Sequence, residues 1–333
     1  MTHLAILWRR LARSRRVTLG AVVLGLLALL GVFAELLAAP TPIAWTGPRG
    51  VEILPAVTDA AALAELSEEQ LAARYEGGAA LWPPVRHGPT RPAAAGPHAP
   101  SSRRHPLGTD AEGRDLAARL IYGARTAIGL SLSAVLVGML LGVAHGGLAG
   151  TYRGFWNDRL VHLVETVGTF PAIIVVALVR AIEREPSALS LVIAVAIVRW
   201  AEIARLVHAE VLRASAEEYV LSAKALGSTR LRIFWRHILP NAIGPAIVSS
   251  VFGVASVVLL EAAISFLAMG APSHAASWGE TLSEAAHHPR ELRLLLLPGA
   301  LLLATVGGSY LLADALQDAV DPRTARAGGR DGP

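Results

Sequence analysis

Residues able to carry out chemistry are few in this chain, and none stands in a catalytic pattern. The single lysine, Lys224, is not preceded by the Gly-x-x-x-x-Gly of a phosphate-binding loop, so a nucleotide cannot be held by that route. His274, His287 and His288 lack the i, i+4 spacing of histidines that bind a metal from one helix face. No Gly-x-Ser-x-Gly elbow surrounds a serine. We therefore expect no catalytic residue, no cofactor and no metal site.

Charged residues inside apolar segments are the second group that could carry function. Glu165, Arg199, Glu202 and Glu261 all interrupt long hydrophobic runs. A charge at the centre of a bilayer costs roughly a few kcal/mol on insertion scales. We therefore expect these side chains to face other helices or a water-filled cavity.

The elements that must position these residues are membrane helices. The chain is 53% hydrophobic and 17% charged, whereas soluble domains carry about a quarter charged residues. A spanning helix needs roughly 20 apolar residues, and the sequence predicts an all-α membrane protein with six such helices. They are expected near 17–39, 126–150, 159–181, 188–207, 242–269 and 293–316.

The arginines that flank these segments predict the orientation, because basic residues in short loops favour the cytoplasmic side. One topology places four basic clusters and both termini in the cytoplasm. The net charge of +4 therefore indicates membrane orientation and not nucleic-acid binding, since the arginines are divided among loops. The run 17–39 exceeds the 7–15 apolar residues of a signal peptide, so we expect a retained anchor, with cleavage after Ala39 as the alternative.

Five parts of the chain follow from this topology. A cytoplasmic N-terminus (1–16) precedes the first transmembrane helix (17–39) and a periplasmic loop (40–118). A five-helix core (119–316) contains a cytoplasmic loop (208–241), and a cytoplasmic tail (317–333) ends the chain. Within the outer loop, 60–75 has helical spacing. We expect the 40–104 segment either to dock an external substrate-binding protein or to form a variable cover.

The polar run 215–241, SAEEYVLSAKALGSTRLRIFWRHILPN, carries the clearest local signals. Ser215 and Glu218 have capping-box spacing, which predicts a helix start. Gly227 suits the position after a helix C-terminus, and Ser228 or Thr229 can cap a second helix running to Leu239, where Pro240 either stops it or marks the start of the next span. By spacing alone, a basic loop that only obeys the positive-inside rule remains an equal alternative.

The second half of this run resembles the cytoplasmic EAA loop of ABC-importer permeases. In the dipeptide and oligopeptide branch that half reads R-H-I-L-P-N, which is present at 236–241. The first half departs from the family, because Leu221-Ser222-Ala223 stands where relatives have Glu-Ala-Ala. Glu217 or Glu218, one helical turn earlier, could replace the missing acidic contact.

Five further motifs of the C-type permease subunit occur in the family's order. The signature HPLGTDAEGRD at 105–115 is followed by IYGAR at 121–125. LEAAISFL at 260–267, SWG at 277–279 and DAVDPR at 318–323 come later in the chain. The resemblance therefore covers most of the chain and is weakest over 40–100.

The resemblance implies a non-catalytic permease subunit of an ATP-driven importer for dipeptides or oligopeptides. It implies type I importer architecture in the inner (plasma) membrane, with a cytoplasmic coupling helix. The implied partners are a homologous second permease, two ABC ATPases that hydrolyse ATP, and a periplasmic or extracellular substrate-binding protein. Relatives with these motifs also carry glutathione, nickel complexes or peptide antibiotics, and no residue here identifies the cargo.

A stand-alone secondary transporter or a non-transporting membrane scaffold is the alternative function. A secondary transporter would be expected to show internal repeats with broken helices and would need no docking loop. The sequence shows no convincing repeat.

The resemblance also assigns expected roles to single residues. Arg199 is expected to face the translocation path or to pair with Glu165, and Glu261 to hydrogen-bond between helices rather than to contact substrate. The translocation-path candidates are Glu165, Arg199 and Glu261. The expected ATPase-coupling residues are Glu217, Glu218, Ser222, Ala223, Lys224, Ala225, Gly227, His237 and Pro240.

Overall fold

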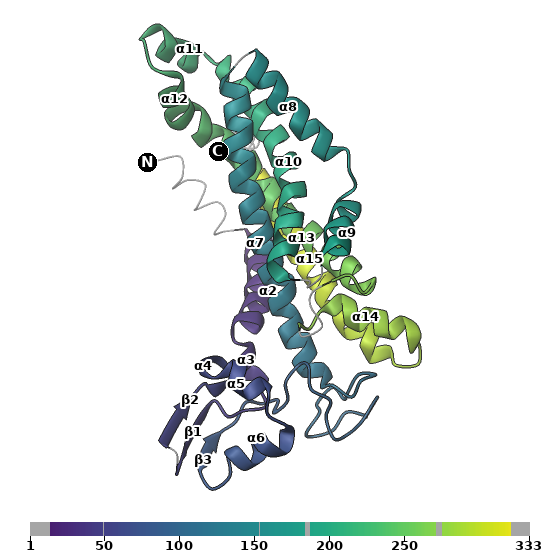
Figure 1. The fold of residues 1–333 in the computed structure, drawn as a ribbon. Coiled ribbons are helices and arrows are strands. Elements are labelled where there is room, and N and C mark those ends of the chain that lie inside the picture. The colour runs from purple at the N-terminus through teal and green to yellow at the C-terminus, as the bar shows by residue number, and fades with distance from the viewer. Residues whose placement is uncertain (1–13, 49, 153, 184–186, 271–274, 321–333) are drawn as a thin grey trace, which may run out of the picture. The chain divides into compact units, whose positions relative to one another are not determined.

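The computed structural model describes the chain from residue 14 to residue 320, apart from positions 49, 153, 184–186 and 271–274 (Figure 1). The arginines expected to orient the N-terminus up to Arg13, and the tail from residue 321, lie outside the described residues. The chain divides into two compact units. The first contains 1–24, 130–260 and 304–333, and the second contains 25–129 and 261–303.

The first unit is helical, and in it the C-terminal part of α7 packs closely against α10. Helix α7 spans Leu116–Thr151 and α10 spans Ala188–Ser215. Glycines occur on α7 at 138, 142, 146 and 150, one per helical turn, and all four face α10. A Cβ on Gly146 would lie only 2.3 Å from the carbonyl oxygen of Ala204. Small residues at such spacing let two helix backbones approach closely, as in membrane helix pairs.

Four helices of the described chain are long and apolar enough to cross a membrane. They are α2 (Arg15–Val32), α7, the continuous helix Arg230–Phe266, and Leu292–Ala319 within α15 (Leu292–Val320). The third expected span is not one straight helix, because α8 (Phe155–Gly168) and α9 (Ala172–Ile182) meet at an 82° bend. Pro171, in an extended conformation at the start of α9, accounts for the break.

The fourth expected span lies within α10, which is long enough to cross a membrane but less apolar than these four helices. It is 28 residues long and carries Arg199, Glu202, Arg205, Glu210 and Arg213. By composition the described chain thus has four spans, or five when the bent pair is counted as one. The expectation of six differs at α10, because its cationic and acidic residues offset its apolar ones.

Pro240 does not stop the helix that precedes it. Helix α12 (Arg230–Ile233), the π-helical turn η1 (Phe234–Ile238) and α13 (Leu239–Phe266) run on without interruption. The amide of Leu239 bonds to the carbonyl of Phe234, five residues back. A wide π turn next to a proline fits the ring and the missing N–H into a continuing helix. Of the two roles expected for Pro240, the helix stop is therefore wrong, whereas the start of the next span agrees with α13, which begins at Leu239.

The second unit contains a small antiparallel sheet that the sequence did not predict. Its strands are β1 (Ala44–Gly47), β2 (Gly50–Ile53) and β3 (Ala79–Leu81), in the order β2-β1-β3. The four short helices of this region are α3 (Ala34–Leu37), α4 (Pro55–Thr58), α5 (Ala60–Ala64) and α6 (Glu68–Arg74) (Figure 1). Strands of three or four residues carry too little alternation to be recognised from sequence.

A compact apolar cluster holds the sheet and these helices together. Trp45, Leu63, Leu71 and Tyr75 are buried in it, and the indole of Trp45 donates to the carbonyl of Tyr75 at 3.2 Å. The helix expected over 60–75 is divided in two, because Ser67 and Gln70 form a capping box that starts α6.

Candidate functional site

Helix α11 (Glu218–Ala225) is attached to the first unit by one apolar face. Val220 and Ala223 are buried in a cluster with Val207, Val211 and Phe234, which come from α10 and η1. The two buried positions are three residues apart, so they share one side of a short helix. The remaining sides of α11 are left open to solvent.

The corner after α11 has the geometry that its glycine predicts. Gly227 has a φ of +79°, and its amide bonds to the carbonyl of Lys224. The amide of Ser228 bonds to the carbonyl of Ala223, which completes a Schellman motif. Thr229 then caps α12 by accepting from the amide of Arg232, as expected for one of the two proposed caps.

The start of α11 differs from the expected capping box. Ser215 is the last residue of α10, and Glu217 occupies the N-cap position without a side-chain cap bond. Glu217 lies 3.8 Å from Arg213, and the ammonium of Lys224 donates to the carbonyl of Ser215 at 3.4 Å. The capping box failed because α10 continues to Ser215, so that residue is not available to cap a new helix.

Large apolar side chains are exposed on both sides of the corner. Leu226 is 86% exposed and Leu221 is 51% exposed, while Leu231 and Trp235 on the following helix are also more than half exposed. Exposed apolar groups of this size, rimmed by Glu218 and other polar residues, are typical of a surface that binds another protein. Because they are exposed, these side chains contribute little to the packing of the described residues of the first unit.

The other residues expected for ATPase coupling lie close to this surface. Ser222, Lys224 and Ala225 are exposed on α11. The ring of His237 lies 6.4 Å from that of Tyr219, and its carbonyl accepts from the amide group of Asn241 at 2.9 Å. The structure thus brings α11, its glycine corner and the ring of His237 close to one another.

Arg199 and Glu165 do not pair with each other. Arg199 is buried on α10, where it contacts Glu202 and donates to the carbonyl of Ser249 on α13 at 3.1 Å. Glu165 is exposed on α8 and lies 3.4 Å from His162. The expected pair was wrong because α8 presents Glu165 to solvent, while a closer carboxylate lies one turn along α10. Gly253 also leaves space for the guanidinium of Arg199 on α13.

Replacing Arg199 with alanine is expected to weaken the contact between α10 and α13. The change removes the bond to Ser249 and leaves a void beside Gly138 and Gly253, whereas Glu202 can remain solvated. We expect a lower melting temperature and a lower yield of assembled protein. Arg205→Ala, on the same helix, is the matched control, and unchanged uptake and assembly in Arg199→Ala would rule out any role for Arg199.

Glu261, on α13, forms a hydrogen bond that joins this helix to the start of α14 (Trp278–His287). Its side chain is 1% exposed, and one carboxylate oxygen accepts from the hydroxyls of Ser265 at 2.7 Å and Ser277 at 2.8 Å. Ser277 also caps α14 by accepting from the amide of Gly279, where a Cβ would lie 2.1 Å from the carbonyl oxygen of Ala262. These contacts attach α14 to the end of α13. The carbonyl oxygen of Ala262 leaves no room for a residue larger than glycine at position 279.

Helix α14 is also attached to α7 and to the signature loop, which we define as residues 105–115. The buried indole of Trp278 lies on Gly123 and donates to the carbonyl of Leu120 at 3.0 Å. Four of the sequence motifs therefore meet at α14, namely the signature, IYGAR, LEAAISFL and SWG. Their meeting point could not be read from their separate positions in the chain.

Two arginines join the signature loop to α14 in a charged cluster. Arg114 contacts Glu284 at 2.7 Å and Glu280 at 3.3 Å, and its Nε donates to the fully buried Asp110 at 2.7 Å. Arg119, which is 1% exposed, lies 3.1 Å from both Asp110 and Glu280. We define the outer cluster as Asp110, Glu112, Arg114, Arg119, Glu280 and Glu284. Sequence reasoning missed it, although Glu280 and Glu284 have the i, i+4 spacing that places two carboxylates on one helix face.

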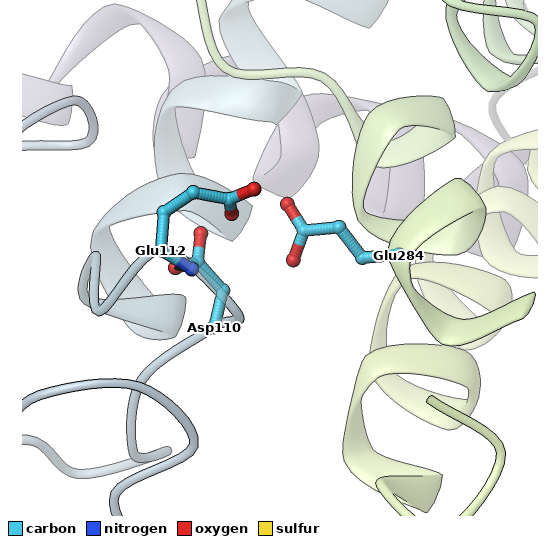
Figure 2. A group of neighbouring side chains, drawn as sticks. All are labelled: Asp110, Glu112 and Glu284. Carbon is cyan, nitrogen blue, oxygen red and sulfur yellow. Dashed lines mark hydrogen bonds between the residues drawn. The ribbon is translucent and has the colours of Figure 1, made fainter. Parts of the chain in front are cut away.

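Three carboxylates of the outer cluster lie close enough to hold a metal ion. Asp110, Glu112 and Glu284 each bring an oxygen within 4.8 Å of the others, and Figure 2 shows the carboxylates of Glu112 and Glu284 directed toward each other. Arg114 contacts all three, including Glu112 at 2.7 Å. A guanidinium therefore already supplies positive charge to this acidic group.

Comparison with known proteins places these features in a family. A model described as the binding-protein-dependent transport system inner membrane component matches residues 134–326. A dipeptide transport system permease protein, DppC, from Alkalihalophilus pseudofirmus is 35% identical over 224 residues, which cover 67% of this chain and 73% of that protein. The oligopeptide transport system permease protein OppC from Bacillus subtilis is 31% identical over 229 residues, covering 67% and 73%. A chain of the MetNI methionine ABC transporter in an inward-facing conformation aligns with 60% of this chain and 97% of its own, with a TM-score of 0.48 and 16% identity.

Proposed function

The chain belongs to the family of binding-protein-dependent transport system inner membrane components, and from this premise we propose that it forms half of the translocation pathway of an ATP-driven peptide importer. The relatives named above are dipeptide and oligopeptide permeases, which supports a peptide cargo. The other half of the pathway is a homologous permease. The ligand range of the cognate external binding protein is the measurement that would identify the cargo.

The observation that carries this proposal is the exposed apolar surface of α11 and its glycine corner. Among the described residues of the first unit, none buries Leu221 or Leu226, whereas Val220 and Ala223 on the same helix are buried against α10 and η1. A separate ATPase subunit with a complementary groove would bury these leucines. The acidic residue of the Glu-Ala-Ala motif is missing from this chain. Exposed Glu217 and Glu218, at the start of α11, supply carboxylates at the edge of the same surface.

The helix α12–η1–α13 gives the docked surface a mechanical connection to the membrane. It runs without a break from Arg230 to Phe266, so a displacement of α11 and its corner is passed into a helix of membrane-spanning length. Closure of two ATPases on ATP would thereby move the permease between inward- and outward-open states. ATP is hydrolysed by these partners and not by this chain.

The proposed topology places α11 and both termini in the cytoplasm and the second unit's sheet outside the inner membrane. The sheet and its helices then form a surface that an external substrate-binding protein can contact. Exposed Glu165 and buried Arg199 stay as candidates for the translocation path, with a path-facing role proposed for Glu165 on the basis of its exposure on α8.

Changing Leu226 to glutamate is expected to prevent copurification of the ATPase subunit. The side chain is almost fully exposed, so the change should leave the fold intact while it puts a charge into the docking surface. The matched control is Leu81→Glu, which introduces the same charge at a residue 62% exposed on β3. The control should retain the ATPase.

Copurification also separates the importer from a solitary secondary transporter or a scaffold. If the unmodified chain brings no ATPase with it under mild solubilisation, or if Leu226→Glu retains the ATPase as well as the control does, the docking proposal is wrong.

A further inference from the structure

The outer cluster holds more negative than positive charge. Arg114 and Arg119 face the four carboxylates of Asp110, Glu112, Glu280 and Glu284. Two guanidinium groups cannot neutralise four ionised carboxylates. Packing α14 against the signature loop therefore brings the nearly buried Glu284 close to the buried Asp110 with too little positive charge to neutralise the cluster, which is unfavourable.

Glu284 is the carboxylate whose surroundings most favour a proton. Its side chain is 11% exposed, and one of its oxygens, Oε2, is buried without a hydrogen-bond partner among the described residues. Oxygens of Asp110 and Glu112 lie within 4.8 Å of an oxygen of Glu284 (Figure 2). Carboxylates this close to one another repel, so a proton on one of them is favoured.

The charged and titratable groups around Glu284 come from three elements. The signature loop contributes Asp110, Glu112 and Arg114, α7 contributes Arg119, and α14 itself contributes Glu280. On α14, His288 lies with its Nδ1 3.2 Å from the carbonyl oxygen of Glu284, and its ring contacts that of His98. Burial, followed by the charge of Asp110, raises the pKa of Glu284 to about 7, against the opposing effect of Arg119.

We propose that α14 docks on the signature loop with a proton on Glu284, which removes the repulsion between this carboxyl group and those of Asp110 and Glu112. Docking of α14 is then linked to the pH of the medium around the second unit. Acidic medium tightens the attachment, and alkaline medium loosens it by ionising Glu284. The inference rests on the contacts of the second unit and does not depend on the proposed transport function.

The direction of this effect follows from proton linkage. When α14 is displaced, Glu284 becomes solvated and returns toward its ordinary pKa of 4.5, whereas the docked side chain has a pKa of about 7. The docked state therefore binds the proton more tightly, and its advantage is complete below pH 4.5 and is lost as the pH rises through 7. From pH 6 to pH 8 the equilibrium constant for displacement should rise about tenfold.

The absence of cysteine from the sequence allows a direct test. Ala285 is buried on α14 and Ala286, its neighbour, is exposed. We would measure maleimide labelling of Ala285→Cys and of Ala286→Cys in permeabilised membrane vesicles that contain the full chain. The ratio of the two rates cancels the pH dependence of thiol chemistry and reports displacement of α14. We expect this ratio to rise about tenfold from pH 6 to pH 8.

Substitutions of single carboxylates identify the group that titrates. Glu284→Gln, a neutral isostere, should give a low ratio that does not change with pH. Glu280→Gln removes a carboxylate from the same helix face and should keep the pH-dependent rise. Glu112→Gln should move the midpoint of the rise to lower pH, because the charge of Glu112 also raises the pKa of Glu284.

Three outcomes would overturn the proposal. One is a pH-independent ratio in the chain with native carboxylates, and another is an unchanged rise in Glu284→Gln. The third is a rise that appears only with added Mg²⁺ or Ca²⁺ and disappears with a chelator, which would assign the acidic group to a bound cation. Should Glu284→Gln fail to accumulate, the shift in Glu112→Gln decides, and an unshifted midpoint rejects the proposal.

Discussion

Gly227→Val is expected to abolish transport while binding of substrate to the external receptor stays intact. Gly227 has a φ of +79°, a region that is strongly unfavourable for a β-branched residue. No atom lies within 4 Å of the position that a Cβ would take, so the effect is one of backbone strain and not of collision. The strain, about 1–2 kcal/mol or more, would open the corner and displace α11 from its Schellman geometry. Uptake of labelled peptide by cells checks the result.

Two controls separate strain at this corner from strain in general. Gly77→Val places the same side chain at a φ of +74° in the second unit, again with no neighbour within 4 Å, and should leave uptake largely unchanged. Gly227→Asn should retain much of the activity, because asparagine tolerates the left-handed conformation. Normal uptake by Gly227→Val would refute the idea that this corner transmits motion.

Replacing Arg114 with methionine is expected to cause the largest loss of stability in the second unit. Asp110 is fully buried and accepts from Arg114 Nε, while the side chain of Glu284 is 11% exposed and depends on the same guanidinium. Removing one partner of a buried ion pair typically costs about 3–5 kcal/mol, and we expect the lower end of this range because Arg119 still lies 3.1 Å from Asp110. Thermal unfolding in detergent and protease resistance of the signature loop measure the effect.

Arg104→Met is the matched control, because Arg104 is an exposed arginine in the segment just before the signature loop. It should melt as the native chain does. Arg114→Lys should lie between the two, since an ammonium keeps the charge but cannot reach several carboxylates with a planar fork. Equal melting temperatures for Arg114→Met and Arg104→Met would show that the outer cluster contributes little to stability.

Features that depend on residues close together in the chain could be predicted from the amino-acid sequence. The apolar lengths identified α2, α7, α13 and α15, because a bilayer requires a long run of hydrophobic residues. The positive φ of Gly227 and the cap at Thr229 followed from local backbone chemistry. Motif order was enough to identify the family, since each motif is continuous.

Contacts between side chains that are distant in the sequence are visible only in the folded chain. Arg114 and Glu284 are separated by 170 residues, and Glu261 accepts a hydrogen bond from Ser277, 16 residues away. The partner of Arg199 was Glu202 rather than Glu165, because the orientation of α8 placed Glu165 in solvent. Spacing along a helix predicts neighbours three or four residues away. Which carboxylates lie close together depends on how the helices pack. The proton that we propose on Glu284 follows from this packing and could not be predicted from the sequence.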